Sequence, residues 1–153
     1  MTSPPWLQVL QGLLTPVIAM FAVYIAYQQH KTARERLRLD LYNKRFSVYE
    51  ALRDLLALIA REARVDLKHI FEFTGKTRDA DFLFGAEVTG YIEEVRRRAI
   101  DFRYLSDKLG ADTLPAGPER DTIVEREHEH LEWFLGQFDI MQSMFRPYLR
   151  FGT

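Results

Sequence analysis

The segment EREHEHLE, residues 125 to 132, carries the residue types in this chain that are best suited to chemistry. It contains overlapping Glu-x-x-His pairs, Glu125 with His128 and Glu127 with His130. In helical bundles this spacing places a carboxylate and an imidazole on one side of a helix. Two such pairs, with two further carboxylates, can hold a di-iron centre. The first question is therefore whether these side chains form a metal site.

A metal centre needs ligands that face inward and meet at one level of the bundle. On a helix over residues 118–145, Glu127 and His130 point toward the apolar stripe, whereas the other members of the segment point away from it or lie at its border. The best second pair, Asp66 with His69, is expected around 30 Å away at the helical rise per residue. Glu127 and His130 are thus only weak metal candidates, and we predict no metal site.

Composition removes several other classes of function. The formal net charge of −1 gives no basic excess for nucleic-acid binding, and the absence of cysteine excludes thiolate metal sites and cysteine nucleophiles. No serine has the neighbouring His and Asp that would mark a nucleophile. The three arginines at 96–98 point in different directions on a helix, which is typical of a solvated surface. We predict no catalytic residue and no cofactor, so the chain is not expected to be an enzyme; a small-molecule ligand is left open.

The charged residues are distributed very unevenly along the chain. None occurs in the first 30 positions, and a basic cluster then follows, formed by Lys31, Arg34, Arg36 and Arg38. The mostly apolar residues 6–27 would measure about 33 Å as a helix, which matches a hydrocarbon core of about 30 Å. We therefore predict a transmembrane helix over about 6–27 within an N-terminal part of residues 1–30.

The position of the basic cluster predicts the orientation of this helix. A cleavable signal peptide would carry Lys or Arg before its apolar run, whereas here the cations follow it. The positive-inside rule then places the N-terminus outside and the C-terminal body in the cytoplasm. In this arrangement the cluster contacts anionic lipid headgroups, so that membrane lipid is one expected partner.

Small and polar residues form one face of the predicted span. They fall within a sector of roughly 80° on a helical wheel, and they are Gln8, Gln11, Thr15, Ala19, Ala22 and Ala26. Within lipid, helices associate through close approach at small residues and through hydrogen bonds. The face therefore predicts association with a second copy or with another helical protein. Amides that reach headgroups and the lining of a small pore are alternative interpretations.

Pro16 interrupts the hydrogen bonding of this helix near its middle. Its ring removes the bond to the carbonyl of Gly12, which has no side chain to resist bending. We predict a kink at these two positions.

The rest of the chain has helical periodicity throughout, which predicts an all-α fold. Residues 31–43 are expected to form a basic helical stalk and residues 44–153 an antiparallel three-helix bundle in the cytoplasm. The predicted helices, separated by segments rich in Gly and Pro, cover about 37–71, 81–109 and 118–145. Because the connections are short, sequence neighbours should pack in opposite directions.

Arg45 lies on the inward face of the first of these helices and needs a partner there. In a three-helix arrangement it comes level with Glu127, so we predict a structural ion pair between them. A buried guanidinium and carboxylate compensate one another and can fix the register of helices.

The first third of the chain resembles a known group of proteins. The stretch TPVIAMFAVYIAYQQHKTARERLRLDLYNKRFSVYEALRDLL, residues 15–56, is similar to the start of small bacterial inner-membrane proteins. In that group an apolar span ending in a YIAYQQ-like element leads into an RLDLYxKRFxVYEA-like helix. The resemblance implies a single-pass protein of the bacterial inner membrane and implies no activity or catalytic residue.

Three functions fit these observations, and they are given in decreasing order of preference. The first is a membrane-anchored helical interaction or scaffold protein that self-associates or binds a partner. The second is a small membrane-acting oligomer, a pore or effector controlled by its cytoplasmic bundle. The third is an enzyme with a site concealed in the bundle.

Overall fold

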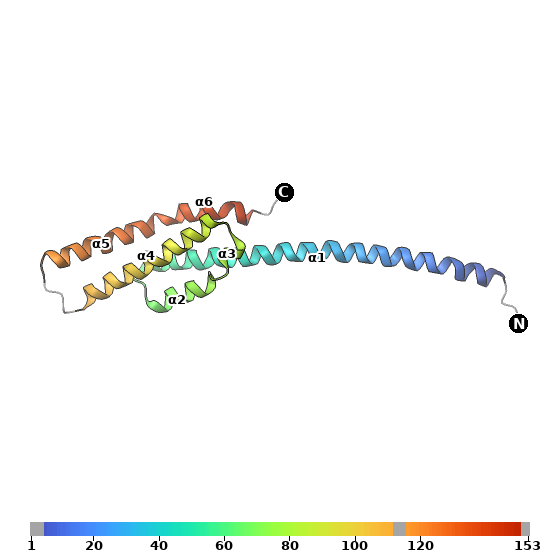
Figure 1. Cartoon of the computed structure of the whole chain (residues 1–153), viewed down its shortest axis with the longest axis horizontal. Helices are drawn as coiled ribbons and strands as arrows, with labels where there is room; N and C mark the ends of the chain where they lie inside the picture. The colour runs from blue at the N-terminus through green and yellow to red at the C-terminus, as the bar shows by residue number, and fades with distance from the viewer. Residues whose placement is uncertain (1–4, 112–115, 151–153) are drawn as a thin grey trace. The chain divides into compact units, whose positions relative to one another are not determined.

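The computed structural model describes the backbone of residues 5–111 and 116–150 and the side chains of residues 16–111 and 116–150. These residues form helices and no strand, as the sequence predicted. The helices are α1 (Pro5–Glu62), α2 (Leu67–Lys76), α3 (Ala80–Leu83), α4 (Ala86–Gly110), α5 (Pro118–Leu135) and α6 (Gln137–Leu149) (Figure 1). Contacts divide the chain into two units, residues 1–40 and 41–153, with the division falling inside α1.

The unit from Leu41 on is a helical bundle. Four segments lie alongside one another in it: the C-terminal part of α1, then α2, α4 and the α5–α6 pair (Figure 1). Each of these segments runs opposite to the one named before it. Fully buried side chains from α1, α4, α5 and α6 form the core of the bundle, and they include Leu52, Leu56, Ile59, Val95, Phe102, Phe134 and Phe145. Burial of such side chains contributes about 1.5–3 kcal/mol each and drives the packing.

The predicted three-helix bundle is corrected at residues 63–66. Instead of one helix to residue 71, α1 ends at Glu62, and the chain reverses before α2. Ala63 adopts φ 47°, and its N–H donates to the carbonyl of Ile59 at 2.8 Å. Helices commonly end with a residue in this left-handed conformation, which is usually glycine. Because alanine takes that place here, the sequence lacked the Gly or Pro signal of a helix end.

The extra reversal changes which helix ends meet. With α2 returning along α1, the start of α4 lies beside the residues of α1 near Arg45, and the end of α6 lies there too. This end of the bundle is marked by the Gly85 N–H, which donates to the Tyr148 hydroxyl at 3.2 Å. At the other end, residues 62–64 line a common pocket with α4 and α5 residues that include Ser106 and Glu127.

The third predicted helix is divided into two. α5 ends at Leu135, and the Gly136 N–H is shared by the carbonyls of Glu132 at 3.1 Å and Trp133 at 3.2 Å. α6 then continues in the same general direction to Leu149, past the expected end at residue 145 (Figure 1). The added turn brings Tyr148 against Phe84, with ring centroids 5.2 Å apart.

Candidate functional site

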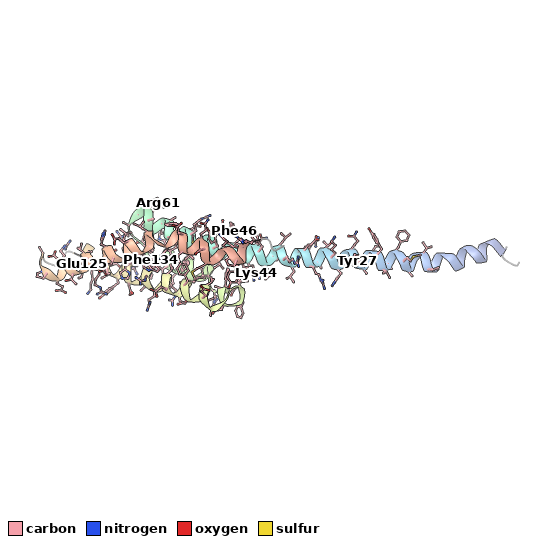
Figure 2. All side chains as sticks on the ribbon, turned by 90° about the horizontal axis from the view of Figure 1, so that it is seen from above. Tyr27, Lys44, Phe46, Arg61, Glu125 and Phe134 are labelled. Carbon is pink, nitrogen blue, oxygen red and sulfur yellow. The ribbon has the colours of Figure 1, made fainter. Side chains whose placement is uncertain are left out.

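The segment of α1 from residue 16 to residue 27 carries apolar side chains around its whole circumference, and most of them are large. Met20, Val23 and Tyr27 are 69%, 70% and 69% exposed, and Phe21 is 65% exposed. Figure 2 shows the side chains around Tyr27 standing out from the helix in several directions. A helix that is apolar all round is stable when something apolar surrounds it, either lipid or partner helices. This segment is therefore a candidate interaction surface.

No helix formed by the described residues is both long and apolar enough to cross a bilayer. The predicted span begins at residue 6, and the side chains of its positions up to 15 lie outside the described residues. Those positions include Gln8, Gln11, Gly12 and Thr15 of the predicted association face and kink. α1 continues through Pro16.

Three members of the predicted association face lie within the described part of the helix. Ala19, Ala22 and Ala26 are all exposed, as are the larger apolar residues between them. Their small side chains leave the backbone of α1 accessible along one face. Association through this face stays a prediction, because none of the residues that the structure describes is packed against it.

The basic cluster lies directly after the apolar segment. Lys31, Arg34, Arg36 and Arg38 are exposed, and none of them has an ion pair within the part of the chain that the structure describes. Because no carboxylate among the described residues pairs with these cations, they are available to anionic groups outside the chain.

The acid and histidine segment lies on α5, where it divides into an outer and an inner face. Outside, His128 Nε2 lies 3.3 Å from Glu132 Oε1, and both side chains are about two-thirds exposed. Inside, Glu127 and His130 are half-buried, as the periodicity predicted. Among the described residues no group of three His, Asp or Glu side chains is placed to hold a metal ion.

The predicted ion pair between Arg45 and Glu127 does not form. Arg45 Nε donates to the carbonyl of Leu83 at 3.0 Å, and its guanidinium carbon lies 5.6 Å from the centre of the Tyr148 ring. The carboxylate of Glu127 instead accepts a hydrogen bond from the Ser106 hydroxyl. The reason is the reversal at residues 63–66, which places the two residues toward opposite ends of the bundle.

The contact between α4 and α5 contains a polar cluster that sequence analysis missed. The guanidinium of Arg98 lies 4.3 Å from the centre of the Trp133 ring, and its Nε donates to the carboxylate of Glu94. Hydrogen bonding by Arg98 lowers the pKa of Glu94. The sequence interpreted residues 96–98 as a solvated surface, which fits Arg97 at 69% exposure but not Arg98 at 32%. The spacing of Glu94 and Arg98, four apart on one helix, was the available signal.

His130 belongs to the same contact. Its Nδ1 is shielded from solvent and has no hydrogen-bond partner in the described structure. Burial, followed by the positive charge of Arg98, lowers the pKa of His130. The arrangement therefore favours a neutral imidazole at this position.

A groove between α1 and α2 also carries ionisable groups. It has a volume of about 340 Å³, and its charged lining consists of Asp54, Arg61, Glu72 and Lys76, with His69 beside them. Glu72 and Lys76 are 2.8 Å apart, which lowers the pKa of the first and raises that of the second. The two acidic and two basic side chains together give the groove no net charge. The groove could not be found from the sequence, because it depends on the unpredicted return of α2 along α1.

Comparisons with known proteins identify no relative of this chain. No protein-family model matches it, and no significant match is found among curated proteins or among solved structures.

Proposed function

We propose that this chain is a membrane-anchored interaction protein whose N-terminal helix self-associates in the bacterial inner membrane. The observation that carries the proposal is the apolar surface around the whole circumference of α1 between residues 16 and 27. No described residue of a single copy covers these side chains, and exposure to water would cost about 25 cal/mol for each Å² of apolar surface. Lipid and a second copy of the helix together would remove that cost.

The unpaired cations support the same proposal. Lys31, Arg34, Arg36 and Arg38 follow the apolar segment within a few residues, where they would meet the headgroups of the cytoplasmic leaflet. The N-terminus would then lie outside and the bundle in the cytoplasm. In this arrangement the bundle is the part that presents a folded surface to other proteins.

Membrane anchoring is tested by placing a charge in the apolar segment. The full chain is produced in bacteria, and membranes are extracted with alkaline carbonate. We expect the unaltered chain to stay with the membranes and Val23→Lys to be released in larger amount. The matched control is Phe82→Lys, because Phe82 is 89% exposed but belongs to the bundle. Release of the unaltered chain would contradict the anchoring.

Self-association is tested by cross-linking through introduced cysteines, since the chain has none of its own. Ala22→Cys lies on the face of small residues, and Tyr24→Cys lies on the opposite face. In oxidised membranes we expect covalent dimers mainly from Ala22→Cys. Equal yields from the two variants, or no dimer from either, would contradict association through this face.

A further inference from the structure

His130 is placed at the contact of α4 with α5 among groups of both charges. The charged groups that act electrostatically on His130 are Arg98 and Asp101 of α4 and Arg126 and Glu129 of its own helix. Asp101 and Glu129 are exposed and favour protonation, whereas burial and the two arginines oppose it. Burial and the arginines have the larger effect and lower the pKa of His130, so the imidazole is neutral in the folded chain at pH 7.

Arg98 cannot move away from this position without losing other contacts. Its Nε is bonded to Glu94, and its guanidinium lies over the ring of Trp133 at 4.3 Å. Trp133 follows His130 by three residues, so both side chains lie on the face of α5 that meets α4. The positive charge of Arg98 is thus fixed beside the histidine.

Protonation of His130 would meet two obstacles. Both ring nitrogens of an imidazolium carry a hydrogen, and Nδ1 is shielded from water with no partner among the described residues, so its N–H would be buried without a hydrogen bond. The imidazolium would also lie near the guanidinium of Arg98, and two like charges repel. Both effects are relieved when α5 separates locally from α4.

We propose that His130 is an acid-sensitive contact that holds α4 against α5 when neutral and loosens this pairing when protonated. In the unfolded chain the pKa of this histidine is the ordinary value of about 6.5. Burial and Arg98 lower the pKa of His130 in the folded chain. The contribution of the neutral histidine to the free energy of unfolding is therefore complete above about pH 6.5 and is lost as the pH falls through the lower pKa of the folded chain. This property does not depend on how the N-terminal helix is used.

The test measures urea unfolding and amide hydrogen exchange of the full chain in neutral detergent at pH 7.5 and pH 5.5. For the unaltered chain we expect a lower unfolding midpoint at pH 5.5, with faster exchange of α5 after correction for the intrinsic effect of pH on exchange. In His130→Gln we expect a smaller change of the midpoint with pH. His128→Gln is the matched control, because His128 is exposed on the same helix; this variant should behave as the unaltered chain does.

An NMR titration of the histidine rings provides a reading that does not depend on the stability of the variant. We expect the His130 resonance to titrate below the ordinary histidine pKa of about 6.5. Arg98→Met should raise the pKa of His130 toward that value. The proposal is overturned if His130 titrates at or above the ordinary histidine value of about 6.5. It is also overturned if His130→Gln keeps the full dependence of the midpoint on pH.

Discussion

Arg45 stabilises the bundle through the backbone of another helix. Its hydrogen bond to the Leu83 carbonyl involves a charged donor and is part-buried, so Arg45→Met should lower the free energy of unfolding by about 1–2 kcal/mol. Glu127 has a different partner, Ser106. In urea unfolding, Arg45→Met combined with Glu127→Gln should therefore give additive losses, within about 0.5 kcal/mol. A clear coupling between the two would mean that they interact.

Gly85 allows α6 to approach the start of α4. A Cβ atom at this position would lie 3.0 Å from the Tyr148 hydroxyl, which also accepts the Gly85 N–H. Gly85→Ala should thus destabilise the bundle by about 1–3 kcal/mol through overpacking. Tyr148→Phe removes the atom that clashes, so the added cost of Gly85→Ala should be smaller in that background. Equal costs in the two backgrounds, measured by urea unfolding, would show that the hydroxyl is not the obstacle.

Ala63, which follows the end of α1, adopts a backbone conformation that suits glycine better than alanine. At φ 47° alanine is strained by about 1–2 kcal/mol, whereas glycine adopts this conformation readily. Since glycine also costs about 0.5–1 kcal/mol of entropy, Ala63→Gly should stabilise the bundle by up to about 1 kcal/mol.

The matched control for this element is Ala60→Gly, three residues earlier, where alanine is exposed within α1. There the same replacement should destabilise the bundle by about 1 kcal/mol, because glycine is a poor helix former. Loss of stability in both variants would show that Ala63 is not strained. Thermal unfolding followed by circular dichroism distinguishes the two results.

For the whole molecule, the division of contacts at residue 40 predicts that the bundle folds by itself. All of its buried apolar residues lie at position 48 or later in the described chain. A fragment of residues 41–153 should therefore unfold cooperatively in urea, with a free energy within about 1 kcal/mol of the bundle in the full chain. Phe102→Ala in the fragment is the control and should lower that value by about 3–5 kcal/mol. A fragment without cooperative unfolding would mean that the N-terminal part of α1 is needed for folding.

The sequence by itself determined the features that depend on local periodicity. Apolar spacing predicted an all-α chain, and it placed Glu127 and His130 on the inner face of α5 while leaving Glu125 outside. These predictions were accessible because the face of a helical residue follows from its position in the sequence alone. The apolar and basic segments at the N-terminus could be recognised from the distribution of charged residues along the chain.

The tertiary structure alone decided which inner faces meet. Ala63 ends α1 without a glycine or proline, so the return of α2 was not visible in the sequence, and this one reversal changed the level of every later helix. Arg45 therefore bonds the Leu83 carbonyl near one end of the bundle, whereas Glu127 bonds Ser106 toward the other end. Partners across helices depend on the number of chain reversals, which short-range spacing does not encode.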